Sequence, residues 1–377
     1  MPTDLSTLLL LGGLFFSAVI GDAAFFGDPL QVQVTLPAKL VEQGVTEDGA
    51  EDVFSSEVGR LGQLASVVTT PTIQVTSRKS VLSALAEPFN LGDVVIALQH
   101  QVGREVVEVH AMATESDDGK GLAMIVLVDL PHEPSMNFSL EQPDGNVLVL
   151  LRRTARETME RVAPYRAALA DLSDSYHGDA AAMARAREVA REALAMPYSE
   201  HRATERVMLH NLLALIALSE GKLPEAQQAL ADGEQVPAAE PGARSMLALN
   251  RAFIALSEKR SADARDDYVR ALNEVRGVDL PGLRSLLFVT AGLVAWSEGD
   301  VAQAEDLLRR AAVADTDSGL PYRYLARLLA ARGETAQAAA AKAAAVARPP
   351  FDHPIPALAI SEYLVDPVNG GFEKRTE

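Results

Sequence analysis

Two histidines are the most direct candidates for chemistry in this chain. His100 and His110 fall in neighbouring stretches of alternating apolar residues, where an acidic side chain such as Glu108 could complete a metal site. If the hairpin turns at Gly103–Arg104, however, position 100 faces about position 107, and the two imidazoles do not converge. We therefore interpret both as exposed strand histidines and expect no metal and no cofactor.

Two short stretches also combine residue types that enzymes use. ESDDGKG (115–121) clusters three acids but lacks the later glutamate of a calcium loop, so it predicts an Asp-Gly hairpin turn. TSRK (76–79) places a serine near a lysine, which a serine capping the next helix explains. The sequence shows no Walker-type glycine loop, dinucleotide fingerprint, nucleophile elbow or zinc-protease helix. We therefore expect no catalytic residue and predict that the protein is not an enzyme.

Charge is distributed unevenly along the chain. Residues 1–150 contain six Lys or Arg against twenty Asp or Glu, and they carry most of the formal net charge of −18. Because phosphate binding requires a basic surface, this acidic front half argues against a nucleic-acid partner. The chain has no cysteine, which excludes disulfides, thiolate metal sites and cysteine nucleophiles.

The first 28 residues predict a membrane anchor or signal segment. Residues 5–21 are uncharged, and apolar residues continue past Asp22 to Phe26. This length is at the short end for a membrane span, so we expect residues 5–26 to form a single-pass anchor in an inner membrane. A cleaved signal peptide ending near Ala23 and a buried helix of a soluble domain are the alternatives. Lys39 follows the span and no Lys or Arg precedes it, which favours a cytoplasmic body over a periplasmic one.

Residues 29–150 show the mixed periodicity of an α+β domain. Period-two patterns predict strands at 31–37, 72–77, 93–101, 105–114 and 122–130, and other patterns predict helices at 45–68, 79–89 and 146–162. Thr46 is the expected cap of the first helix, which has acids in its first turn. This order implies a sheet covered on one face by helices. The layout also resembles the front module of certain bacterial repeat proteins, which implies no particular activity.

Small residues recur through the second half of the chain. In AWSEGDVAQAEDLLRRA (295–311), Gly299 interrupts a helical pattern, and glycine destabilises a helix interior by ~1 kcal/mol relative to alanine. The stretch therefore predicts two antiparallel helices joined by a turn at Gly299. Equivalent turns are expected at Gly221, Lys259 and Gly333. The small residues after the turns, Ala226, Ala264, Ala304 and Ala338, are 38, 40 and 34 residues apart, and Ala214, Ala252, Gly292 and Ala326 precede them.

This spacing resembles that of tetratricopeptide repeats, which are helical hairpins that stack into a solenoid. The resemblance covers about half of the chain, from about residue 163 to residue 350. It departs from the usual pattern at Lys259, where glycine is common, and it fits residues 163–197 only loosely. The resemblance implies an all-α fold and little about function. The expected organisation is a membrane or signal segment (1–28), an acidic α+β domain (29–150), tetratricopeptide-like helical repeats (151–350) and a C-terminal cap or tail (351–377).

In such repeats the first helix of each hairpin lines a concave groove. Applied to this chain, the resemblance places on that inner face Met208, Asn211, Leu215, Met246, Leu249, Phe253, Val289, Leu293 and Trp296, with Arg323 and Arg327 at its far end. Asn211 and Asn250 lack the neighbouring basic residues of repeats that bind a peptide carboxylate. The groove therefore suits an amphipathic helix or a hydrophobic peptide. The alternative is that these side chains pack within the chain.

Together these patterns predict a membrane-anchored, non-enzymatic scaffold or adaptor that binds a protein partner through a tetratricopeptide-like groove. One alternative is an exported periplasmic assembly or envelope-maintenance factor of the same build. Another is an enzyme whose site lies within residues 29–150.

Overall fold

A computed structural model describes residues 30–62, 107–116, 121–130, 133–176, 178–197, 202–237, 239–258 and 260–348. The chain divides into a unit with a β-sheet, which ends at Val162, and a helical unit, which begins at Ala163. The sequence pattern predicts this division at residue 150. The helix that includes position 150 packs on the sheet, however, and therefore belongs to the first unit as far as Val162. The predicted strands at 72–77 and 93–101, the helix at 79–89 and the segments 1–28 and 351–377 lie outside the described residues.

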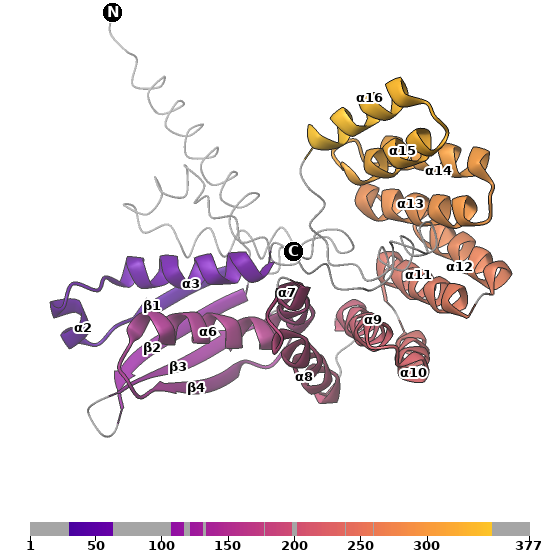
Figure 1. Ribbon diagram of the computed structural model, residues 1–377. Helices are drawn as coiled ribbons and strands as arrows, with labels where there is room; N and C mark the ends of the chain where they lie inside the picture. Colours follow the sequence, from indigo (N-terminus) through magenta and orange to yellow (C-terminus); the bar gives the residue numbers. More distant parts are fainter. Residues whose placement is uncertain are drawn as a thin grey trace, which may run out of the picture. The chain divides into compact units, whose positions relative to one another are not determined.

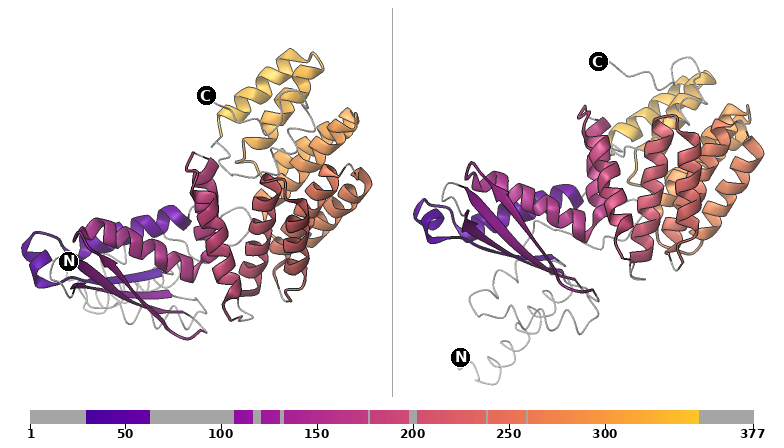
Figure 2. Two further views of the ribbon diagram at one scale, coloured as in Figure 1. Left: turned by 60° about the horizontal axis from the view of Figure 1, so that its bottom comes forward. Right: turned by 90° about the horizontal axis from the view of Figure 1, so that it is seen from below.

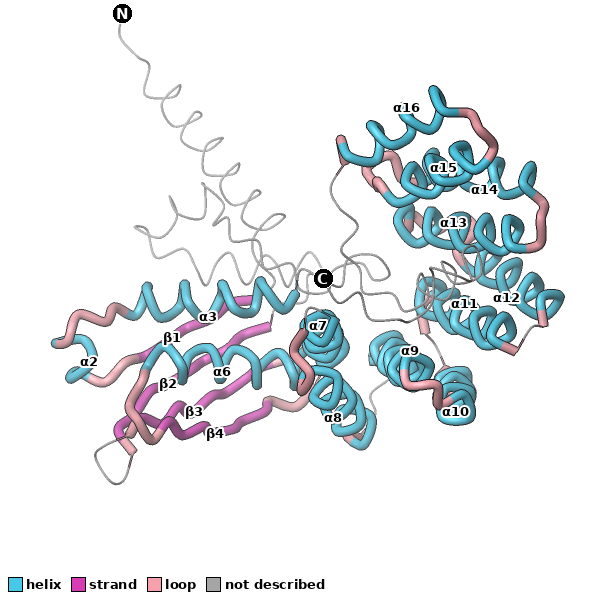
Figure 3. The backbone as a smooth tube through the Cα atoms, viewed as in Figure 1, coloured by secondary structure: helices cyan, strands magenta, loops and turns pink. Residues whose placement is uncertain are grey.

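The first unit is built on a sheet with the strand order β1-β2-β3-β4 (Figures 1 and 3). β1 pairs with β2 in parallel, and the other neighbours are antiparallel. The strands predicted near positions 31, 105 and 122 are confirmed, whereas the last strand was not predicted. The strands are β1 (Leu30–Thr35), β2 (Val107–Glu115), β3 (Leu122–Asp129) and β4 (Met136–Gln142).

Two helices cover one face of this sheet. Helix α3 (Glu47–Gly62) contacts β1, and helix α6 (Val147–Val162) contacts α3, β3 and β4. Alternate side chains of β2 and β3, such as Val109 and Val126, are buried on this face. Burial of these apolar side chains stabilises the layer of helices on the sheet. The described residues therefore have the one-sided α+β arrangement that the sequence predicts.

Helix α3 is fixed at its start by side-chain hydrogen bonds. The backbone N–H of Gly49 donates to Thr46 Oγ1 over 3.1 Å, which confirms Thr46 as the cap. The carboxylate of Glu51 accepts from the N–H of Val34 over 3.1 Å, and that of Glu47 accepts from Leu36 over 3.2 Å. These bonds attach α3 to β1, and the short helix α2 (Ala38–Glu42) lies between them in the chain.

The second unit consists of helices that pack in consecutive pairs (Figures 1 and 2). The second helix of each pair also contacts the first helix of the next pair. The pairs are α7 (Pro164–Tyr176) with α8 (Ala182–Ala195), α9 (Ala203–Ser219) with α10 (Leu223–Glu234), α11 (Pro241–Ser257) with α12 (Ser261–Glu274), α13 (Pro281–Ser297) with α14 (Val301–Ala314), and α15 (Leu320–Ala331) with α16 (Thr335–Val346).

Glycines with positive φ angles lie in the turns within four of these pairs, at Gly178 and at the three predicted positions. Gly221, Gly299 and Gly333 have φ angles of 72°, 86° and 80°, a region of backbone conformation that favours glycine. After Gly299, the N–H of Asp300 donates to the carbonyl of Ala295 over 2.9 Å and closes the end of α13. These turns confirm the predicted glycine positions, whereas Lys259 lies outside the described residues.

Small residues bring the two helices of a pair close together. Ala304 on α14 is fully buried, as are Ala226 on α10 and Ala264 on α12. A Cβ atom added to Gly292 on α13 would lie 3.2 Å from the carbonyl oxygen of Ala304. Ala304 therefore lies where the two helices of this hairpin meet.

The same polar contacts recur in successive pairs. Ser245 on α11 donates to the carbonyl of Ala271 on α12 over 2.9 Å. Ser285 on α13 makes the equivalent bond to Ala311 on α14, also over 2.9 Å. Both bonds join residues that are 26 positions apart in the sequence. The two helices of the α11–α12 pair are therefore aligned with each other in the same register as those of the α13–α14 pair.

Contacts between neighbouring pairs also recur. A glutamate directly follows each of the helices α9, α11 and α13. The carboxylate of each glutamate contacts a side chain from the second helix of the preceding pair. The contacts are Arg187 with Glu220, Gln227 with Glu258, and Arg265 with Glu298. At these three junctions one pair is therefore attached to the next at an equivalent position.

Among the described residues, no helix is both long and apolar enough to cross a membrane. The predicted anchor at residues 5–26 lies outside these residues.

Candidate protein-binding site

The structure buries the residues that the repeat pattern assigns to an open groove. Eight of them are buried and Trp296 is half-buried; the eight are Met208, Asn211, Leu215, Met246, Leu249, Phe253, Val289 and Leu293. These side chains are buried because the first helix of each pair has other helices on several sides. Helix α9, for example, contacts α7, α8, α10 and α11. A helix that is apolar on nearly every side is covered on nearly every side. These residues therefore pack within the helical unit, which corrects the expectation that they line an open surface.

The two asparagines form an internal contact. Asn250 Nδ2 donates to Asn211 Oδ1 over 2.9 Å, and both residues are almost fully buried. The pair joins α9 to α11 and presents no accessible amide to a peptide carboxylate. This geometry agrees with the sequence argument against a carboxylate-binding groove.

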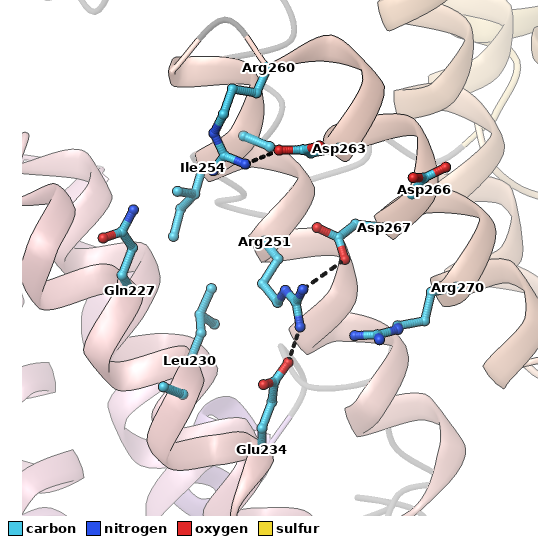
Figure 4. Close-up of a pocket in the computed structure, with 12 residues that line it drawn as sticks. Gln227, Leu230, Glu234, Arg251, Ile254, Arg260, Asp263, Asp266, Asp267 and Arg270 are labelled. Carbon is cyan, nitrogen blue, oxygen red and sulfur yellow. Dashed lines mark hydrogen bonds and ion pairs between the residues drawn. The ribbon is translucent and has the colours of Figure 1, made fainter.

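An open polar recess lies between α10, α11 and α12 (Figure 4). Its volume is about 440 Å³. Leu230 and Ile254 contribute apolar surface, whereas the other labelled side chains are polar or charged. The charged residues that line it are Glu234, Arg251, Arg260, Asp263, Asp266, Asp267 and Arg270.

Arg251 is the central cation of this recess. Its guanidinium forms ion pairs with Glu234 on α10 and with Asp267 on α12, the latter at 3.4 Å. Figure 4 shows the side chain extending between these two carboxylates. An arginine held by two carboxylates keeps a fixed orientation, because its planar donors match carboxylate geometry.

The opposite ends of the recess differ in how their charges are placed. Arg260 pairs with Glu258 and Asp263 near the turn into α12. Asp267 has only 13 % of its side chain exposed, and burial raises its pKa, an effect opposed by the charges of Arg251 and Arg270. Asp266 and Arg270 are exposed. The recess therefore combines the ion pairs of Arg251, one of them with the half-buried Asp267, with the exposed charges of Arg260, Asp263, Asp266 and Arg270.

This chemistry suits recognition of a charged segment. The described lining contains carboxylates and guanidinium groups but no histidine, hydroxyl or thiol that would serve as a nucleophile. The recess could not be predicted from the sequence, because Glu234, Arg251 and Asp267 come from three different helices. The one sequence signal was the dense charge of DARDDYVR (263–270).

The described residues of the first unit offer no alternative metal site. Nowhere in the described ranges do three or more His, Asp or Glu residues cluster to bind a metal. His110 Nδ1 lies 3.0 Å from Gln33 Oε1, and 44 % of the histidine side chain is exposed. Its interpretation as an exposed strand histidine is confirmed, whereas His100 lies outside the described residues.

Comparison with known proteins adds no assignment, since no family model matches the chain and no curated protein matches it.

Proposed function

We propose that this protein is a non-enzymatic adaptor whose helical unit is a tetratricopeptide-like array that binds a partner protein. The observation that carries the proposal is the recurrence of one serine-to-carbonyl bond, from Ser245 to Ala271 and from Ser285 to Ala311. Recurring contacts indicate repeated structural units, and stacked repeats of this kind provide extended surfaces for protein binding.

The polar recess is the proposed contact for that partner. Arginine is enriched among residues that dominate binding energy, and a fixed arginine loses little conformational entropy when a partner binds. Asp266 and Arg270 are four residues apart on α12 and are both exposed. They present one negative and one positive group on the same helix face, which favours a partner segment that carries both charges.

We further propose that residues 5–26 attach this adaptor to a membrane, with the helical unit on the cytoplasmic side. The support is the uncharged run from residue 5 to residue 21 and the position of Lys39 after it. Attachment would hold the partner near the membrane surface.

The recess is tested by exchanging its exposed charges in the full-length chain. The variant Asp266→Arg with Arg270→Glu preserves net charge but reverses the pair. The matched control is Arg191→Glu with Glu192→Arg on α8, where both side chains are also exposed. Affinity purification from the native cells should recover one partner with wild type and control. Recovery should fall at least tenfold with the recess variant, and undiminished recovery would refute the assignment.

A further inference from the structure

The last described helix pair carries a second surface, which differs from the recess in chemistry. A hollow of about 660 Å³ lies between α15 and α16. Its floor consists of alanines from both helices, Ala326, Ala330, Ala338, Ala339 and Ala345. Val346 adds a branched side chain at its margin, and 79 % of that residue is exposed. The hollow is therefore lined by small apolar side chains, and a helix or an extended segment could pack against them.

All the charged side chains around this hollow are cationic. They are Arg323, Arg327, Lys342 and Arg348, and no acidic residue contributes to its described lining. Arg348 is held in place, because its guanidinium lies 4.1 Å from the centre of the Tyr322 ring and donates to the carbonyl of Thr316 over 2.7 Å. Arg323 and Lys342 are exposed. Such an apolar floor with a cationic rim favours an apolar segment that carries carboxylates.

Helix α16 has less of its surface covered than the corresponding earlier helices. In α10, α12 and α14, the second helix of a pair contacts the first helix of the next pair. No helix pair follows α16 within residues 30–348. Only Ala338 and Ala341 of α16 are buried, although eight of its twelve residues are alanine. A contiguous apolar face of this kind is typical of a surface on which another segment packs.

The chain itself supplies a segment with the complementary chemistry. Residues 351–366, FDHPIPALAISEYLVD, begin three positions after Arg348 and contain three carboxylates but no Lys or Arg. Ile360 and Leu364 are four residues apart, as are Glu362 and Asp366. Because Ile360, Glu362, Leu364 and Asp366 are alternate residues, an extended segment would place all four side chains on one face.

We propose that residues 351–366 dock on the α15–α16 surface of the same chain. Their apolar side chains cover the alanine floor, and Glu362 and Asp366 pair with Arg323 and Lys342. The short covalent connection favours this arrangement, because a short tether gives a millimolar effective concentration. The docked segment takes the place that a further helix pair would occupy.

The proposal is tested by disulfide cross-linking in the full-length chain. Because the chain has no native cysteine, an introduced pair provides its only thiols. The test pair is Ala339→Cys on the floor of the hollow with Leu358→Cys in the segment. The control pair replaces Ala339→Cys by Ala340→Cys, which is also exposed on α16 but does not line the hollow. We expect an intramolecular disulfide to form at least tenfold faster in the test pair, detected as a linked peptide by mass spectrometry.

Charge exchange tests the pairing within the same assay. Arg323→Glu with Lys342→Glu should slow the cross-link at least tenfold, and adding Glu362→Lys with Asp366→Lys should restore it. The variant Glu362→Gln with Asp366→Gln changes no residue of the described helices, and it should also slow formation of the disulfide. The test therefore remains valid even if the variant with Arg323→Glu and Lys342→Glu fails to fold. Equal rates for the test and control pairs would overturn the proposal. A disulfide between two chains, or charge exchange without rescue, would also overturn it.

Discussion

Replacing Ala304 with leucine tests the packing of one helix pair. Ala304 is fully buried on α14, and its carbonyl oxygen would lie 3.2 Å from a Cβ atom added to Gly292 on α13. The same added atom would lie 3.2 Å from Leu308 Cγ. The helices are therefore in close contact here, and the extra carbon atoms of leucine can fit only if the helices move apart.

The expected loss of stability is ~1–3 kcal/mol, which is typical of overpacking a well-packed contact. For a unit of this size, each kcal/mol lowers the melting temperature by about 2–4 °C, so the helical unit should melt roughly 2–12 °C lower. The protein has one tryptophan, Trp296 on α13, so its fluorescence follows unfolding of the helical unit. Urea titration monitored by this fluorescence gives the change in the free energy of unfolding.

Ala302→Leu is the matched control, because Ala302 lies on the same helix and is exposed. An exposed substitution of this kind should change stability by no more than ~0.5 kcal/mol. If both variants shift the urea midpoint equally, the close contact between α13 and α14 at Ala304 is refuted.

Three further perturbations have definite expected outcomes. Phe253 is fully buried, and its ring meets the Tyr268 ring edge-on with 6.4 Å between the ring centres. Phe253→Ala should therefore lower the free energy of unfolding of the helical unit by ~3–5 kcal/mol, measured by urea titration. An unchanged urea midpoint would indicate that Phe253 is not part of the core and lines an open groove. The hydrogen bond from Arg187 lowers the pKa of the Glu220 carboxyl in the folded protein. The ionised carboxylate therefore stabilises the fold at pH values above the pKa that Glu220 has in the unfolded chain. This contribution is lost as the pH falls through the pKa of Glu220 in the folded protein. Glu220→Gln should therefore flatten the pH dependence of the urea midpoint between about pH 5 and pH 3, and an unchanged pH dependence would contradict this contribution. Full-length protein should remain with membranes after carbonate extraction, and its recovery in the soluble fraction would exclude the anchor at residues 5–26.

Local features of the fold could be predicted from the sequence because their cause is local. Gly299 and Gly333 adopt positive φ angles that favour glycine, so the residue type itself marks the turn. Thr46 caps α3 through a bond to an N–H three residues away, which is also visible as a sequence pattern. β4 was missed although its Met136, Phe138 and Leu140 alternate with polar residues as in the other strands.

The candidate site could not be predicted in the same way, because it depends on which helices become neighbours. Periodicity shows that Leu249 and Phe253 are apolar, but it does not show that α9, α10 and α12 surround their helix. The recess likewise depends on Arg251 reaching carboxylates on both α10 and α12. No periodicity within one helix contains that information.

Photo-cross-linking from the recess tests the central claim, that the helical unit binds a partner protein there. A photo-reactive amino acid is introduced at position 266 of the full-length chain in its native cells, with the exposed position 192 on α8 as the control. The account predicts one partner adduct from position 266, weakened at least tenfold by Arg251→Glu and absent from position 192. No adduct from position 266, or the same adduct from both positions, would contradict it.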